Sequence, residues 1–137
     1  MIRTRLAALA AAALGTAVQA RPAERTTDEV VAHHIQAAAA GDLDAVTGDY
    51  ADDAVLMTPA VTLQGKAAIR ANFQSMWAVP GGRPVFDSRQ LKSEGDVGYI
   101  QWVMNAGKPG AGTGKDAVIV RHGKIVVQVV FLGPPPN

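Results

Sequence analysis

Apolar positions recur at helical spacing in the first half of the chain and alternate along the second half. Thr26 and Glu29 have the spacing of a capping box, which predicts a first helix that ends at Gly41. A second, short helix is predicted after Asp42, where positions three and four residues apart would share a face: Leu43, Val46, Thr47 and Tyr50. A third helix follows Gly65, and one of its faces carries Ile69, Asn72, Phe73, Met76 and Trp77.

Short alternating segments predict the strands. Residues 54–58 and 61–64 can pair across a tight turn, and four longer strands are predicted over residues 84–94, 97–106, 115–121 and 124–132. Short turns between consecutive strands indicate an antiparallel meander. The pattern predicts an α+β fold, in which a cone-shaped, curved, antiparallel-rich sheet wraps around three N-terminal helices and leaves a pocket at its open end.

Residues 1–20 have the three parts of a secretory signal peptide. Arg3 and Arg5 give a basic start, residues 6–18 an apolar core, and Val18-Gln19-Ala20 a small-residue cleavage pattern. The apolar run of about 13 residues is too short to span a bilayer, and no later segment approaches the roughly 20 residues needed. The sequence predicts an exported protein, periplasmic or secreted, that starts at Arg21 and has no membrane insertion after signal removal.

The rest of the chain fits one domain. Removal of residues 1–20 from the 137 leaves 117 residues, enough for one hydrophobic core. We expect a flexible entry over residues 21–27, the folded domain over residues 28–132 and a Pro-rich tail over residues 133–137.

Composition removes several classes of function. The chain has no cysteine, which excludes disulfides, a thiol nucleophile and a thiolate metal site. Without Arg3 and Arg5 it carries 11 basic and 12 acidic residues, and it has no run of five basic residues, so nucleic acid is not an expected partner. His33 and His34 are adjacent on a helix and point about 100° apart, so we expect no metal site there. No cofactor is predicted.

The last strand is apolar on both faces. Residues 125–131 alternate without a polar side chain except Gln128, which predicts that both faces of the strand are covered. The helices provide one cover, and a second copy of the chain is the expected other, so we predict a homodimer. On the strand at 97–106, alternation separates Ile100, Trp102 and Met104 from Tyr99, Gln101 and Val103, and one set should line the pocket.

The chain resembles the nuclear transport factor 2-like superfamily in two stretches, AAGDLDAVTGDYADDAVLMTPAVTLQGKAAIRANF and VIVRHGKIVVQVVFL. It is most similar to the SnoaL-like and ketosteroid-isomerase-like branch. The shared features are GD at the start of helix two, YADDA before the first strand, G-x-x-x-I-x-x-x-F, and a final GKI hairpin. The resemblance implies the nuclear transport factor 2-like, cystatin-like fold. It does not fix the activity, because one scaffold carries isomerases, cyclases, hydrolases and binding domains.

The resemblance also places the catalytic positions of the steroid isomerases on this chain. Thr58 stands where the carboxylate base belongs, and a threonine cannot take a proton from carbon near neutral pH. His34 replaces the tyrosine of the oxyanion hole, and Asp116 lies near the position of the buried aspartic acid. Steroid isomerisation by the family's mechanism is therefore not expected.

Two candidate groups remain for acid–base chemistry. His34 and Asp116 would face each other across the pocket if the cone forms, as a donor and acceptor pair that works on a ligand or merely satisfies itself. The other predicted pocket residues are Tyr50, Thr58, Asn72, Phe73, Trp77, Gln101, Trp102 and Gln128. We expect binding of a small, largely apolar molecule. An enzyme of isomerase, cyclase or hydrolase type, a non-catalytic ligand-binding domain and a dimeric protein-interaction module stay open as alternatives.

Overall fold

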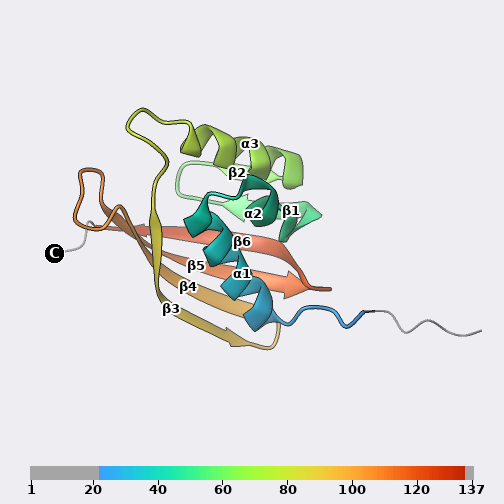
Figure 1. The fold of residues 1–137 in the computed structure, drawn as a ribbon. Coiled ribbons are helices and arrows are strands. Elements are labelled where there is room, and N and C mark those ends of the chain that lie inside the picture. The colour runs from blue at the N-terminus through green and yellow to red at the C-terminus, as the bar shows by residue number, and fades with distance from the viewer. Residues whose placement is uncertain (1–21, 135–137) are drawn as a thin grey trace, which may run out of the picture.

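A computed structural model describes residues 22–134 of the chain. The predicted signal peptide, and all but the first two residues of the predicted tail, lie outside this range. Nine elements follow in order (Figure 1): α1 (Thr27–Ala40), α2 (Leu43–Gly48), β1 (Tyr50–Met57), β2 (Thr62–Gln64), α3 (Lys66–Trp77), β3 (Phe86–Glu94), β4 (Val97–Met104), β5 (Gly112–Arg121) and β6 (Lys124–Gly133).

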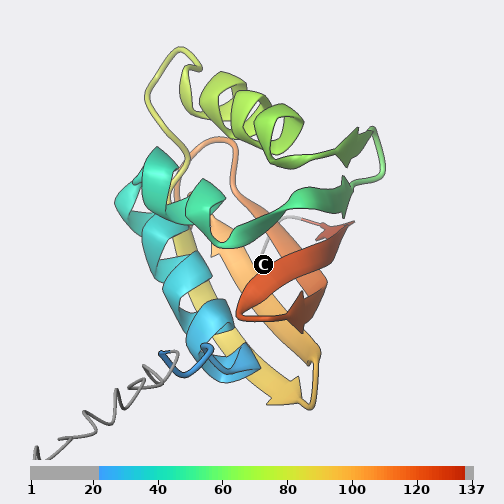
Figure 2. The ribbon, with the colours of Figure 1, turned by 90° about the vertical axis from the view of Figure 1, so that its right-hand side faces the viewer.

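The sheet is curled and open, and it confirms the predicted α+β cone. Its six strands have the order β2-β1-β6-β5-β4-β3, in which β3 to β6 form the expected antiparallel meander. The pairing of β1 with β6 is parallel, so the sheet is mixed. The helices lie on the inner side of the curl, with α1 across the long strands and α3 beside β1 and β2 (Figures 1 and 2).

Local sequence signals fix the first two helices. Thr26 and Glu29 form the predicted capping box, in which each side chain accepts a hydrogen bond from the other residue's backbone N–H. Gly41 ends α1 in the left-handed region, with φ of 71°. The side chain of Asp42 then caps α2 by accepting from the Ala45 amide.

The predicted second helix was too long. Helix α2 ends at Gly48, and Tyr50 begins β1 four residues before the predicted strand. The cause is tertiary pairing, because the Ile125 amide on β6 donates to the carbonyl of Asp49 and Tyr50 stands opposite Ile125. Tyr50 is fully buried as a strand residue.

A glycine brings α1 close to the sheet. A Cβ atom added at Gly98 on β4 would lie 2.6 Å from Val31 of α1 and 2.7 Å from Val118 of β5. The missing side chain therefore lets α1 lie against β4, and the α1 residues Val30, Val31 and His34 are buried. Among the described residues, no helix is both long enough and apolar enough to cross a membrane.

Within residues 22–134, no helix or loop covers the outer face of the sheet, which is largely apolar. Strand alternation and register put these side chains on it: Val55, Met57, Val97, Tyr99, Ala117, Ile119, Val127, Val129 and Phe131. Met57 is 42% exposed and Phe131 58%. Within the described chain, the last strand is therefore covered on its inner face only. The homodimer that would cover the outer face stays a prediction.

Candidate functional site

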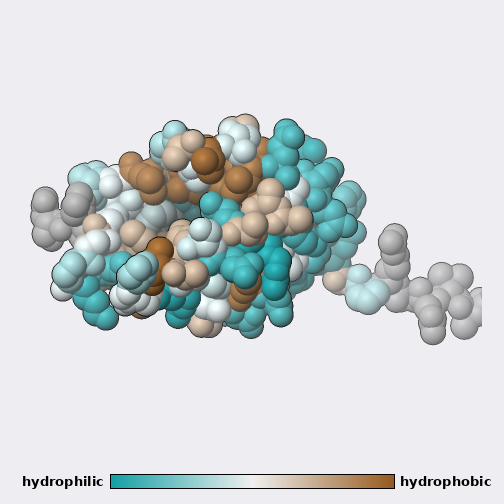
Figure 3. Space-filling model, turned by 90° about the horizontal axis from the view of Figure 1, so that it is seen from above, coloured by the Kyte–Doolittle hydropathy of each residue, from teal (hydrophilic) through white to brown (hydrophobic). Residues whose placement is uncertain are grey.

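The curl of the sheet encloses a cavity of about 520 Å³. Its walls are mainly apolar and come from α1, α3, β1 and the long strands, with Ile35, Leu56, Phe73, Met76, Phe86, Met104 and Val130 among them. Seen from the end where α3 lies, the surface carries a group of hydrophobic side chains (Figure 3). His34 and Asp116 both line this cavity, 3% and 6% exposed respectively. The structure therefore brings the two predicted acid–base residues to one site.

Four side chains form a hydrogen-bonded row across four neighbouring strands, which we call the polar chain. Tyr50 on β1 donates its hydroxyl hydrogen to the Gln128 carbonyl oxygen on β6. Gln128 donates from Nε2 to Oδ2 of Asp116 on β5 over 2.8 Å. Trp102 on β4 donates from Nε1 to the other carboxylate oxygen of Asp116 over 3.0 Å. Both oxygens of the buried carboxylate are thereby satisfied.

Burial has the largest effect on the pKa values of the two titratable side chains in the polar chain, Asp116 and Tyr50. Removal from water raises the pKa of Asp116, and the hydrogen bonds from Trp102 and Gln128 together with the ring of His34 offset only part of that rise. Burial also raises the pKa of the Tyr50 hydroxyl well above its usual value, and the charges of Asp116 and Asp49 add to the effect. Tyr50 therefore stays a neutral donor, while Asp116 is the member that can take up a proton.

The approach of Trp102 to Asp116 depends on Gly114. This glycine on β5 stands opposite Trp102, and a Cβ atom there would lie only 2.0 Å from the indole ring. Phe86 of β3 packs edge-to-face against the other side of the indole, with ring centroids 5.4 Å apart. The indole is held flat over Gly114, where its N–H reaches the carboxylate.

His34 reaches the cavity from α1. Its ring packs edge-on against Tyr50 and Phe73, with centroid separations of 5.3 and 6.3 Å. Its Nδ1 atom is enclosed and lies 3.6 Å from Oδ2 of Asp49, beyond hydrogen-bond length. His34 and Asp116 make no direct hydrogen bond in the described part of the chain, so the predicted donor and acceptor pair does not close on itself.

Of the eight other predicted pocket residues, five line the cavity and three do not. Asn72, Phe73, Trp102 and Gln128 line the cavity. Thr58 also lines it, but its hydroxyl accepts from the amides of Ala60 and Val61 and so holds the turn after β1. Tyr50 and Trp77 lie behind the lining: Tyr50 bonds Gln128, and Trp77 packs on Phe73 beneath the guanidinium of Arg83.

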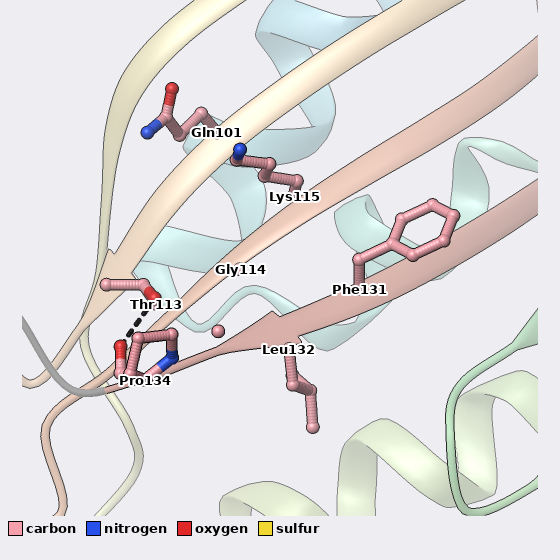
Figure 4. Close-up of a pocket in the computed structure, with 8 residues that line it drawn as sticks. Gln101, Thr113, Gly114, Lys115, Phe131, Leu132 and Pro134 are labelled. Atoms are coloured by element: carbon pink, nitrogen blue, oxygen red, sulfur yellow. Dashed lines mark hydrogen bonds between the residues drawn. The ribbon is translucent and has the colours of Figure 1, made fainter.

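Gln101 lies on the opposite face, away from this cavity. It borders a separate hollow of about 430 Å³ with Lys115 and Phe131, near the end where Thr113 donates to the carbonyl of Pro134 (Figure 4). The alternation on β4 had separated Gln101 from Trp102, and burial of the aromatic ring decided which of the two faces inward.

Sequence reasoning missed Asp49. It is 1% exposed and lies behind His34, with its carboxylate against Arg25 and His33. The signal for it was an aspartate directly before a buried tyrosine, which becomes visible only once α2 ends at Gly48. No group of three His, Asp or Glu residues within residues 22–134 is arranged to hold a metal ion.

Comparison with known proteins identifies the family. The family model of the SnoaL-like domain matches residues 31–128. This chain belongs to the SnoaL-like family. The predicted membership of the nuclear transport factor 2-like superfamily is thereby confirmed. No curated protein gives a significant sequence match.

Solved structures share the SnoaL-like fold. An NTF-2 like protein of unknown function from Burkholderia xenovorans LB400 is 26% identical, with a TM-score of 0.68 over 80% of this chain and 84% of its own. An NTF2-like protein of unknown function from Cytophaga hutchinsonii is 16% identical, with a TM-score of 0.69 over 83% and 96%. A protein with a ketosteroid isomerase-like fold from Catenulispora acidiphila, in complex with trimethylamine, is 19% identical, with a TM-score of 0.66 over 77% and 86%.

The close approach of Trp102 to Gly114 can be tested by adding one methyl group. Gly114→Ala should push the indole off the strand, break its bond to Asp116 and lower the free energy of unfolding by about 1–3 kcal/mol. Near-ultraviolet circular dichroism and urea unfolding measure the two effects. Gly112→Ala is the control, because its new Cβ would meet Met104 at an ordinary 3.6 Å. Equal stability of the two variants would contradict the assigned packing.

The raised pKa of Asp116 predicts a pH-dependent stability difference. Between its ordinary value of 3.8 and the raised folded value, the folded protein binds more protons than the unfolded one, so Asp116 costs stability as pH rises through that window. The free energy of unfolding of the wild type minus that of Asp116→Asn should fall by about 1.4 kcal/mol for each pH unit inside the window, then stay level above it.

Urea unfolding from pH 4 upward measures this difference. Asp49 is present in both proteins, so its own contribution cancels. Asp53→Asn, which removes an exposed carboxylate from β1, is the control for a general charge effect. A wild-type-minus-variant difference that does not change with pH would show that Asp116 titrates alike in the folded and unfolded chains.

Proposed function

We propose that this SnoaL-like domain binds a small, largely apolar molecule in the cavity and holds its polar end against His34 and Asp116. The observation that carries the proposal is a cavity of about 520 Å³ whose apolar walls end on buried polar groups. Such a cavity removes apolar surface from water and orients the guest by a few polar contacts. Trimethylamine bound to the similar Catenulispora acidiphila protein supports small-molecule binding on this fold.

The polar end supplies groups for acid–base catalysis of the isomerase, cyclase or hydrolase type. Histidine is the side chain that exchanges protons most readily near neutral pH, and burial raises the pKa of the Asp116 carboxyl toward that range. Each group can therefore hold or release a proton beside a bound molecule. Turnover would need the ligand to lie within hydrogen-bond reach of one of them.

Non-catalytic binding is the alternative, and two observations favour it. Both oxygens of Asp116 already accept hydrogen bonds inside the polar chain, and the hydroxyl of Thr58 is engaged in a turn. A site built this way can recognise a polar end without moving a proton.

Two further parts of the proposal come from the sequence and the outer face. We propose that residues 1–20 direct export and are removed, and that the uncovered apolar face of β1, β4, β5 and β6 pairs with a second copy of the chain.

Filling the cavity should weaken ligand binding. Val130→Phe places a ring inside the cavity and should weaken binding of the neutral fluorescent probe N-phenyl-1-naphthylamine at least about tenfold. Val129→Phe is the matched control, because the neighbouring residue on β6 points to the outer face. Fluorescence titration of both variants measures the effect. Equal losses in the two variants, or a wild type that does not bind the probe, would contradict cavity binding.

Processing and association can be read from one sample. Protein expressed with residues 1–20 in a bacterial host and isolated from the periplasm or medium should start at Arg21 by intact mass, and native mass spectrometry should give a dimer. Val129→Lys places a charge on the outer face and should yield monomers that bind the probe. An unprocessed chain argues against export, and a monomeric wild type argues against the outer-face dimer.

A further inference from the structure

A buried ion cluster lies behind His34. The carboxylate of Asp49 meets Nη1 of Arg25 at 2.8 Å and Nδ1 of His33 at 2.9 Å. Arg25 also donates to the carbonyl of Gly123, which ties the chain entry to the last hairpin. His33 and Arg25 are partly open to solvent, whereas Asp49 is 1% exposed. The cluster therefore presents a fixed negative group to the inner side of α1.

The carboxyl group of Asp49 is held in its ionised form. Burial alone would raise its pKa, but His34, His33 and Arg25 outweigh burial and hold the pKa below the ordinary value. A lone pair on Nδ1 of His34 would face this carboxylate at 3.6 Å and be repelled, whereas an N–H there is attracted. The geometry therefore favours the proton on Nδ1.

The remaining ring nitrogen is the one that meets the cavity. Nδ1 is enclosed, has no hydrogen-bond partner among the described residues and lies on the side of Asp49, while the ring of His34 lines the cavity, which leaves Nε2 as the nitrogen available to it. Edge-on packing against Tyr50 and Phe73 fixes the plane of the ring. With its proton on Nδ1, neutral His34 offers the Nε2 lone pair to whatever occupies the cavity.

We propose that Asp49 is a positioning residue: it sets the tautomer of His34 so that Nε2 accepts a proton or hydrogen bond from a neutral, hydroxyl-bearing apolar ligand. This inference rests on the proposed binding function. The charged groups that face His34 are Asp49 from the β1 entry and Asp116 from β5, with Arg25 behind Asp49. The carboxylate of Asp116 in the cavity wall and that of Asp49 behind His34 disfavour an anionic ligand, and Nε2 selects a donor.

The tautomer can be observed directly in the wild-type protein without any ligand. Long-range ¹H–¹⁵N correlation spectra at a pH where His34 is neutral should show the proton on Nδ1, the reverse of the form that free histidine prefers in water. His34→Gln assigns the resonances by their loss. A neutral ring protonated on Nε2 would overturn the proposal, whether or not the cavity binds anything.

Removing the charge of Asp49 tests its role. Asp49→Asn keeps the shape of the side chain and should shift the neutral His34 ring toward the Nε2 proton. Asp53→Asn removes one carboxylate from the exposed part of β1 and should leave the tautomer unchanged. A tautomer that Asp49→Asn does not move would overturn the positioning role. If Asp49→Asn does not fold, the wild-type spectrum still decides.

Matched probes test the ligand class. 1-Adamantanol and 1-fluoroadamantane have similar size, but only the first donates a hydrogen bond. Calorimetry should show the alcohol bound about fivefold more tightly by the wild type, adamantane-1-carboxylate bound least, and the alcohol's advantage lost in Asp49→Asn. Equal affinity of the wild type for 1-adamantanol and 1-fluoroadamantane would overturn the proposed ligand class. Failure of all three probes to bind, with the Nδ1 tautomer present, would count against the binding function alone.

Discussion

A buried carboxylate that must be satisfied organises the inner face of this protein. Asp116 accepts from Trp102 on one side and from Gln128 on the other, and Tyr50 completes the row. These four residues come from β4, β5, β6 and β1, which are consecutive neighbours in the sheet. Leaving a buried donor or acceptor unpaired costs about 1–3 kcal/mol, so the polar chain ties the register of all four strands to one another.

The two sides of the cavity hold charge in different ways. On the sheet side, burial dominates and Asp116 gains proton affinity. On the helix side, Arg25 and two histidines surround Asp49, and its negative charge persists. His34 lies between these two environments because α1, the helix that carries it, packs closely over Gly98. Because the two aspartates lie in different surroundings, Asp116 can take up a proton whereas Asp49 remains a fixed negative charge.

The sequence predicted much of this arrangement where local chemistry decides it. The capping box at Thr26, the stop at Gly41 and the meander follow from short-range patterns. His34 and Asp116 were found through the resemblance, which supplies long-range placement that periodicity lacks. Tyr50 was assigned to a helix and Asp49 was missed because the helical spacing continued past Gly48, and only pairing with Ile125 ends it. Gln101 was assigned to the pocket because alternation separates two faces without saying which one is inside.

The polar chain also bears on how the cavity exchanges water for a guest. Tyr50, Gln128, Asp116 and Trp102 find their partners in one another, so water is not needed to complete their bonds. An apolar guest can displace solvent from the walls without stripping a partner from the carboxylate. The desolvation cost of filling the cavity is then small on the sheet side, because covering the aromatic walls leaves these polar groups paired.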